Sequence, residues 1–197
     1  KFEEKSASSN KTVSFEEKIV LSLMKKMRTW FCEGRRGVLV DCLFLLLKNS
    51  KDEALAAISQ EYIWTSWNSN ESEEVLSEME AAANYLSRGN FSNALGHLKK
   101  AIDLDPMHAE ARNRLSTVLF MMNDFKESEK EAIKVTELEP RHFGALNGLA
   151  MIRMKEGDYS TALKYLKQVA SINPWMNASV LRRNMAVCQA ALTASMM

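Results

Sequence analysis

Hydrophobic, small and polar positions recur with a fixed period over the second half of the chain. The three prolines set the register, because Pro140 lies midway between Pro106 and Pro174. Four further sets share this spacing: a turn-forming residue, an aromatic residue, a small residue, and an apolar residue two places before each proline. They are Gly89, Asn123 and Gly157; Phe91, Phe125 and Tyr159; Ala94, Ser128 and Ala162; and Leu104, Leu138 and Ile172. A fixed period of this length, about 34 residues, is typical of a repeat array.

Each repeat is predicted to contain two helices joined by a tight turn. The glycine or asparagine position lies between two stretches of helical periodicity, where the chain needs a residue that tolerates left-handed dihedral angles. The small residues allow the two helices to approach closely, and the proline ends the second helix. The predicted repeats span residues 75–108, 109–142 and 143–176.

This pattern resembles the tetratricopeptide repeat. The third repeat matches the family consensus well, with Ala-Leu-Asn-Gly-Leu-Ala at residues 145–150 and Gly-Asp-Tyr at residues 157–159. The second repeat departs from it, with Ser116 and Ser128 at the small positions. The resemblance implies an all-α fold, a right-handed α-solenoid in which three helix pairs occupy residues 71–176.

Helical periodicity continues on both sides of the repeats. Residues 1–13 are polar without periodicity and are predicted to be disordered. Residues 14–70 are predicted to form a helical extension with helices at 14–31, 38–48 and 51–67. Ser14 and Ser50 each precede a glutamate by three residues, which predicts capping boxes at the starts of the first and third of these helices. Residues 177–197 are predicted to form a helix that covers the apolar face at the end of the array.

The predicted helix at 14–31 is amphipathic and lies in a basic segment. Phe15, Ile19, Leu23 and Met27 follow at helical spacing, and residues 18–36 contain six basic residues against one acidic residue. A helix of this kind can bind an anionic membrane surface. It can equally pack on the array with its charges in solvent, and both interpretations stay open.

Two short motifs carry a second resemblance. Residues 63–67 read Ile-Trp-Thr-Ser-Trp, which places Trp64 and Trp67 on one helix face, and residues 138–146 read Leu-Glu-Pro-Arg-His-Phe-Gly-Ala-Leu. Both are similar to elements of a family of bacterial tetratricopeptide proteins and their plant organellar relatives. The resemblance implies a plastid (chloroplast) location, with a mitochondrion or the bacterial cytoplasm as alternatives. Because the chain begins at Lys1 rather than methionine, we expect that a segment precedes it, where a targeting peptide would lie.

Composition argues against several classes of function. The formal net charge is +1, which favours no polyanionic partner. The three cysteines and three histidines lack metal-ligand spacing, so no metal or cofactor is predicted. No nucleophile or carboxylate pair suggests an enzyme, and the third repeat and end helix show no basic stripe for nucleic acid. The most apolar run, residues 38–47, is too short to span a membrane.

The concave surface of the array is the predicted binding site. In tetratricopeptide arrays the first helix of each pair lines this surface. In this chain the corresponding positions are apolar and rich in methionine, which adapts to varied shapes, and asparagine recurs where it could pair with a peptide backbone. The predicted partner-binding residues are Met79, Leu86, Asn113, Thr117, Phe120, Asn147, Met151 and Met154. Alternatively, the N-terminal helices or the end helix already fill this groove.

One class of partner is disfavoured. Repeat domains that hold the acidic EEVD tail of cytosolic chaperones use a clamp of lysine, asparagine and arginine side chains. At four positions of that clamp the chain has Met79, Ala83, Gly144 and Gly148. A carboxylate would find no charge-assisted partner there, so binding of this tail is not expected.

The loop between the second and third repeats holds Arg141 and His142, which could contact a partner or an acidic group. In the alternative, structural interpretation, Phe143 packs between the repeats, Gly144 permits close packing, and Arg141 pairs with a nearby carboxylate.

The predicted function is a non-enzymatic interaction scaffold, an adaptor or assembly factor. Its concave groove would hold an apolar or amphipathic segment of a client protein. The alternative is a peripheral membrane protein that docks through residues 14–36.

Overall fold

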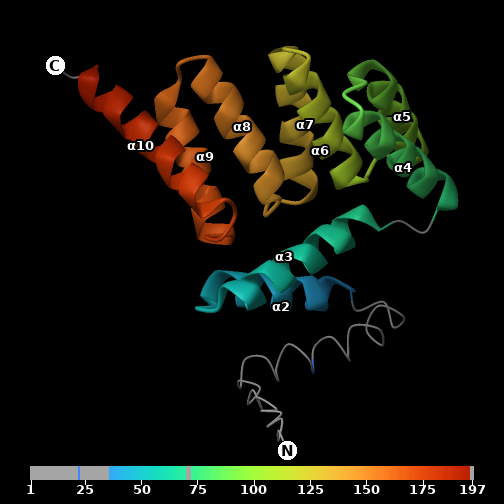
Figure 1. Cartoon of the computed structure of the whole chain (residues 1–197), viewed down its shortest axis with the longest axis horizontal. Coiled ribbons are helices and arrows are strands. Elements are labelled where there is room, and N and C mark those ends of the chain that lie inside the picture. The colour runs from blue at the N-terminus through green and yellow to red at the C-terminus, as the bar shows by residue number, and fades with distance from the viewer. Residues whose placement is uncertain (1–21, 23–35, 70–71, 196–197) are drawn as a thin grey trace, which may run out of the picture. The chain divides into compact units, whose positions relative to one another are not determined.

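The computed structural model describes residue 22, residues 36–69 and residues 72–195, and the regular elements in this part of the chain are all α-helices (Figure 1). In chain order they are α2 (Arg36–Asn49), α3 (Glu53–Asn68), α4 (Glu73–Ser87), α5 (Phe91–Leu104), α6 (Ala109–Met121), α7 (Phe125–Leu138), α8 (Phe143–Lys155), α9 (Tyr159–Ile172) and α10 (Ala178–Ala194). The chain divides into two compact units, residues 1–42 and 43–197, and the repeats lie in the second. The predicted all-α fold is confirmed.

Three helix pairs stand where the sequence period predicts them. The pairs α4–α5, α6–α7 and α8–α9 are hairpins that stack in chain order (Figure 1). Their turn residues Gly89, Asn123 and Gly157 have φ angles of 70°, 63° and 79°. This left-handed region favours glycine and tolerates asparagine, so the predicted turns are confirmed.

Each helix of the repeats begins with a capping side chain, which accepts a hydrogen bond from a backbone N–H of the first turn. The six capping residues, in chain order, are Ser72, Asn90, His108, Asp124, His142 and Asp158. The two histidines occupy equivalent positions in successive repeats, before α6 and α8. Their Nδ1 atoms accept from Ala111 (3.3 Å) and Ala145 (3.2 Å). Polar residues between the repeats thus fix where each new pair starts.

The two serines at the small positions of the second repeat are buried and satisfy each other. The Ser116 hydroxyl donates to the Ser128 carbonyl oxygen (2.8 Å), and the Ser128 hydroxyl donates to the Ser116 carbonyl oxygen (2.7 Å). A buried hydroxyl without a partner would be costly. The departure from the consensus is therefore accommodated by a reciprocal pair of hydrogen bonds between α6 and α7.

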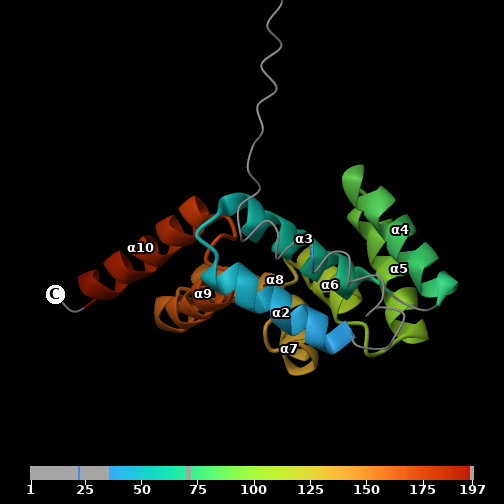
Figure 2. The same cartoon turned by 90° about the horizontal axis from the view of Figure 1, so that it is seen from below.

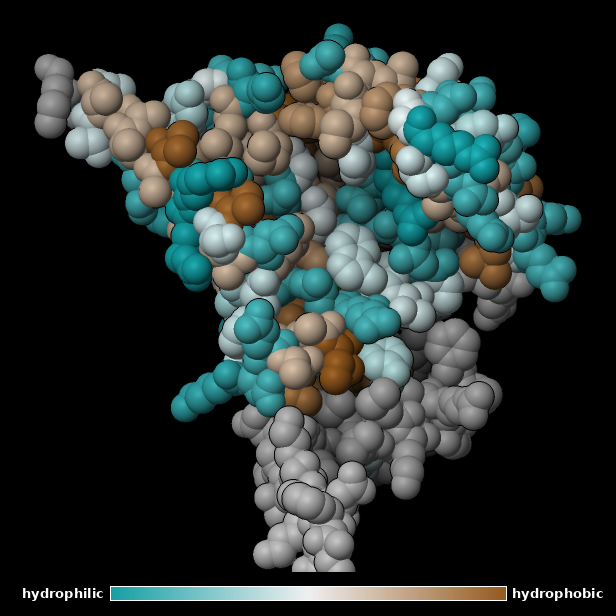
Figure 3. All heavy atoms as spheres, viewed as in Figure 1, coloured by the Kyte–Doolittle hydropathy of each residue, from teal (hydrophilic) through white to brown (hydrophobic). Residues whose placement is uncertain are grey.

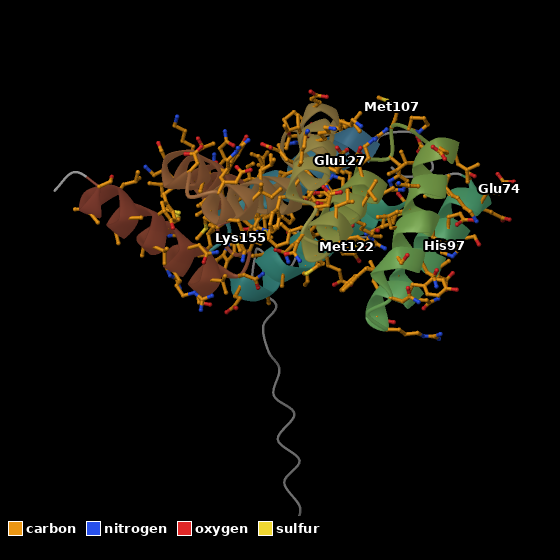
Figure 4. The ribbon with its side chains drawn as sticks, turned by 90° about the horizontal axis from the view of Figure 1, so that it is seen from above. Glu74, His97, Met107, Met122, Glu127 and Lys155 are labelled. Carbon is orange, nitrogen blue, oxygen red and sulfur yellow. The ribbon has the colours of Figure 1, made fainter. Side chains whose placement is uncertain are left out.

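The first repeat is held by a polar contact as well as by its core. His97 of α5, labelled in Figure 4, donates from Nδ1 to Glu78 of α4 over 2.6 Å. The same imidazole stacks on the Tyr85 ring, with ring centroids 5.3 Å apart. These contacts join the two helices of the pair on its partly exposed side.

The helix α10 packs on α9 at the end of the array (Figure 1). Leu181 and Cys188 of α10 are buried, as expected of a helix that covers the last apolar face. Burial raises the pKa of the Cys188 thiol. This thiol should therefore react slowly with alkylating reagents.

The start of α3 differs from the prediction. The helix begins after Asp52, whose Oδ1 accepts a hydrogen bond from the Ala54 N–H (2.8 Å). Ser50 instead accepts from the Asp52 N–H (3.0 Å), too early in the chain to cap the helix. The predicted capping box of Ser50 and Glu53 is wrong, because the Asp52 carboxylate lies nearer the helix, accepts a hydrogen bond from one of its first N–H groups, and interacts favourably with the helix dipole.

Two tryptophans fix α3 against the loop between the second and third repeats. The Trp67 ring stacks on His142, with centroids 4.0 Å apart and 17° between the planes. The Trp64 ring meets Phe143 edge-on at 5.2 Å. Seen from below, α3 crosses in front of α6 and α8 (Figure 2). The structure therefore shows where the paired tryptophans of residues 63–67 bury their apolar surface.

Side-chain hydrogen bonds hold α3 at two further points. Asn68, at its last turn, accepts from Arg114 of α6 over 2.5 Å. Gln60 accepts from Asn173, a fully buried residue after α9, over 2.6 Å. The segment is thus an integral part of the repeat unit, tied to its second and third repeats.

Gly144 makes a close approach to α3 that a larger residue could not. A Cβ at this position would lie 2.8 Å from Cη2 of Trp64, whereas one at Gly96 of α5 would meet nothing within 4 Å. We therefore expect Gly144→Ala to destabilise the fold by about 1–3 kcal/mol through overpacking. Gly96→Ala should stabilise it by about 0.5–1 kcal/mol through helix propensity.

Urea denaturation of the two variants measures this difference. If both variants changed the free energy of unfolding by the same amount and in the same direction, the Trp64 ring would be shown to move aside without cost.

The predicted amphipathic helix at 14–31 and the membrane alternative rest on residues 14–36. Of these, the structure describes only Ser22 and Arg36, both helical. The predicted disorder of residues 1–13 falls outside the described residues too. Among the helices that are described, none combines the length and apolarity needed to cross a bilayer.

Candidate functional site

A hollow of about 360 Å³ opens between the second and third repeats and α10. Its walls come from α6, α7, α8, the α9–α10 connection and α10 itself. Figure 3 shows this face, with hydrophobic side chains gathered over α10 and over the turn between α6 and α7. No residue of α3 lines the hollow. The sequence analysis offered the N-terminal helices or the end helix as segments that could fill the groove. In the described part of the chain, α10 forms a wall of the hollow, and α3 does not line it.

The walls of the hollow are largely apolar with a few amide groups. Its apolar lining includes Phe120, Met121, Met151, Met176, Val180 and Leu181. Its amides come from Asn113, Asn147, Asn177 and Asn184. Apolar walls with few polar groups are typical of sites that bind a ligand or peptide.

Five of the eight predicted partner-binding residues line this hollow. They are Asn113, Thr117, Phe120, Asn147 and Met151. Met154 is partly buried on α8 but does not line it. The structure thus gathers the predicted residues of the second repeat and most of those of the third.

The two predicted residues of the first repeat lie elsewhere. Met79 is only 4% exposed and packs with Val75 and Ala82 in the core between α4, α5 and α6, and Leu86 packs against that core. The first repeat has no repeat before it, so the buried stripe of α4 is narrow and faces α5. Met79 therefore serves the core, and its predicted place in the groove is corrected.

The contribution of α10 was missed by sequence reasoning. Residues 177–184 supply about a third of the lining, including Val180, Arg183 and Asn184. The sequence analysis treated this helix as a cover for the last repeat or, in the alternative, as filling the groove, and it named none of the helix residues as part of the site. The run of three polar residues Arg182, Arg183 and Asn184 near the start of this helix was the signal that could have identified it.

A buried carboxylate organises the polar groups beneath the hollow. Glu110 is 4% exposed and accepts hydrogen bonds from Arg114 (2.9 Å), Asn113 (2.9 Å) and His142 Nε2 (3.2 Å). Because His142 Nδ1 accepts from the Ala145 N–H, the imidazole carries its proton on Nε2 and donates it to Glu110. Burial raises the pKa of Glu110, but the hydrogen bonds from His142 and Arg114 outweigh burial, and the pKa lies below its usual range.

The two asparagines of the predicted site are therefore not equivalent. Asn113 uses its Nδ2 to hold Glu110. Asn147 makes no hydrogen bond to a described residue, so both the NH₂ donor and the carbonyl acceptor of its side chain are available to a ligand backbone.

The predicted loop contacts are arranged as the structural interpretation expects. His142 has no exposed surface, so its side chain cannot reach a partner outside, and its acidic contact is Glu110 within the chain. Arg141 pairs with Glu139 (3.0 Å) and lies 4.3 Å from the centre of the Phe44 ring. Phe143 is fully buried. Among the residues that the structure describes, no cluster of metal-binding side chains is present.

Comparisons with known proteins agree with this architecture. Two tetratricopeptide repeat family models match, one over residues 85–151 and the other over residues 143–174. No curated protein sequence matches the chain. The family-specific resemblance of residues 63–67 and 138–146, with the location it implies, stays a prediction.

Solved tetratricopeptide domains share the fold. The first such domain of Spaghetti (RPAP3), bound to the HSP90 peptide SRMEEVD, matches with a TM-score of 0.59 and 19% identity, over 62% of this chain and 96% of that chain. The TPR2B domain of yeast Sti1, from a complex with pHsp70, matches with a TM-score of 0.57 and 18% identity, over 60% of this chain and 98% of that chain. The Sgt2 domain from Aspergillus fumigatus matches with a TM-score of 0.57 and 13% identity, over 63% of this chain and 82% of that chain.

At these identities the solved structures bear on the fold alone. The family models match most of the part of the chain in which the structure has three stacked helix pairs. The left-handed turns lie between the two helices of each pair, at the spacing of the repeat. Over residues 85–174 the chain consists of tetratricopeptide repeats.

Proposed function

We propose that the chain is a non-enzymatic interaction scaffold that holds an apolar or amphipathic segment of a client protein in the hollow between the second and third repeats and α10. The observation that carries this proposal is the apolar lining of the hollow beside an uncommitted amide at Asn147. Phe120 and Met151 would receive an apolar side chain, and Asn147 would pair with the backbone of the segment. The peptide bound to the Spaghetti domain supports a peptide ligand as a class.

The size of the hollow favours a short anchor over a whole helix. Ligand pockets commonly measure about 300–1,000 Å³, and this one lies near the lower limit at about 360 Å³. We propose that one or a few apolar side chains of the client enter it, while the rest of the segment runs along the concave surface.

We propose that an acidic chaperone tail is not the client. Of the four clamp positions, Met79 lies in the core, Ala83 carries no charge, and Gly144 and Gly148 have no side chain to offer a carboxylate. The peptide SRMEEVD, which is bound by the Spaghetti domain, should therefore bind this chain no more tightly with a free C-terminal carboxylate than with an amidated one in a fluorescence polarisation titration. Micromolar binding that requires the free C-terminal carboxylate would contradict the exclusion.

The groove proposal is tested with an array of short acetylated and amidated peptides that carry apolar residues in amphipathic arrangement. We expect peptides retained by the wild-type chain to lose at least about thirtyfold in affinity with Phe120→Ala plus Asn147→Ala, because each substitution removes a central contact worth more than about 1 kcal/mol. Met122→Ala is the matched control, since Met122 lies at the end of α6 and is exposed outside this hollow.

Thermal melting of each variant separates loss of binding from loss of fold. Asn147→Ala alone removes an amide that makes no hydrogen bond to a described residue, so it should bind more weakly without a change in melting temperature. Equal retention of the peptides by all variants would reject the groove as the binding site. Asn113 is unsuitable for this test, because its replacement would also disturb Glu110.

A further inference from the structure

The repeat unit carries its charges unevenly along its length. Residues 73–139 contain thirteen acidic and eight basic residues, whereas residues 159–195 contain four basic residues and no acidic residue. The near-zero formal charge of the whole chain hides this difference. The end of the array formed by α9 and α10 is therefore positive relative to the repeats before it.

One of these basic residues lies at the hollow. Arg183 of α10 is the only charged residue among the described residues that line it. Arginines of the second and third repeats each pair with a carboxylate: Arg112 with Glu131, Arg114 with Glu110, and Arg153 with Glu129 and Glu156. Arg183 is exposed and forms no ion pair with a described residue. The guanidinium of Arg183, at the rim of an apolar hollow, therefore has its planar set of N–H donors available to a ligand.

Resting on the proposed function, we propose that the client segment carries an aspartate or glutamate beside its apolar anchor, and that Arg183 pairs with this carboxylate. The planar guanidinium can bind a carboxylate through two parallel hydrogen bonds. A single cation in an otherwise neutral lining suits one carboxylate and gives no track for a polyanion such as nucleic acid. The helix α10 would then select the client as well as cover the last repeat.

The test uses the full chain and three matched sets of short acetylated and amidated peptides. The sets share the same leucine, methionine and phenylalanine anchors and differ only in their flanking residues, which are acidic, neutral polar or basic. We expect the acidic set to bind about tenfold more tightly than the basic set at low salt, with the difference shrinking as salt rises. Because the peptides have blocked termini, their only carboxylates are those of side chains, and any preference for the acidic set reports on these.

Two charge reversals on adjacent residues locate the effect. Arg183→Glu should reverse the preference, so that the basic set binds more tightly than the acidic set. Arg182→Glu is the matched control, since Arg182 is exposed on the same helix and does not line the hollow. It should keep the preference for acidic peptides, and both variants should melt like the wild-type chain because the two side chains are exposed.

The outcomes separate the two proposals. Equal binding of acidic and neutral peptides that Arg183→Glu leaves unchanged would overturn the role of Arg183 while the groove proposal stands. Equal effects of the two reversals would assign the preference to the general charge of α10 and also overturn it. Binding of no set above the level of the Phe120→Ala plus Asn147→Ala variant would overturn both proposals.

Discussion

Replacing Phe143 with alanine is expected to lower the free energy of unfolding by about 3–5 kcal/mol. Phe143 has no exposed surface, and it is the largest fully buried side chain among the residues that the structure describes. Its ring lies 5.2 Å from that of Trp64 and 5.0 Å from that of Trp67. The substitution therefore leaves a cavity and also weakens the attachment of α3, because both tryptophans lose the ring they pack against.

Urea denaturation followed by circular dichroism measures this loss, with Met107→Ala as the control. Met107 is 70% exposed in the connection between the first two repeats, so its truncation should change stability by no more than about 0.5 kcal/mol. Hydrogen exchange adds a local reading: amides of α3 should exchange faster in Phe143→Ala than in the wild-type chain. A loss below about 1 kcal/mol, or unchanged protection of α3, would show that the tryptophans hold the helix without Phe143.

The repeat fold was predictable because its determinants are local and recur. The turns need left-handed residues, and Gly89, Asn123 and Gly157 supply them at a fixed spacing. The small positions need little volume, and serine fits at Ser116 and Ser128 as long as the two hydroxyls satisfy each other. Each of these requirements can be read from a few neighbouring residues in one repeat.

The contacts that depend on tertiary structure could not be read in the same way. The paired tryptophans of α3 indicate a buried face, but their partners His142 and Phe143 lie two repeats further along the chain. The wall that α10 adds to the hollow likewise depends on how the last repeat and the end helix pack. Met79 was misplaced because the first repeat lacks a neighbour on one side, which no property of Met79 itself reveals.

Glu110 shows the same limit in a single residue. It lies three residues before Asn113 on α6, and its charge suggests an exposed side chain. Its partner His142 lies at the cap of the next repeat, and only the stacking of the repeats brings the two together. A buried carboxylate at this place therefore joins three elements: α6, the loop before α8 and, through Arg114, the end of α3.

Replacing Glu110 with glutamine is expected to lower the free energy of unfolding by about 2–3 kcal/mol at neutral pH. The amide keeps the volume but brings an NH₂ group to a place where three donors converge, so at least one buried donor loses its acceptor. The effect should depend on pH. Burial acts to raise the pKa of Glu110, yet hydrogen bonds from His142 and Arg114 leave it below its usual range.

The sign of the pH dependence follows from that direction. A carboxyl whose pKa is lower in the folded chain than in the unfolded chain contributes stability that is fully present above the unfolded value, about 4.3. The contribution is lost as pH falls through the lower, folded value. Denaturation curves of the wild-type chain and Glu110→Gln should therefore differ most near neutrality and converge on acidification below about pH 4. Glu127→Gln is the control, because its exposed pair with Lys130 should contribute no more than about 0.5 kcal/mol at any pH. A gap between wild type and Glu110→Gln that stays constant into acid would mean that the loss comes from the added NH₂ group of glutamine and not from the charge of the carboxylate.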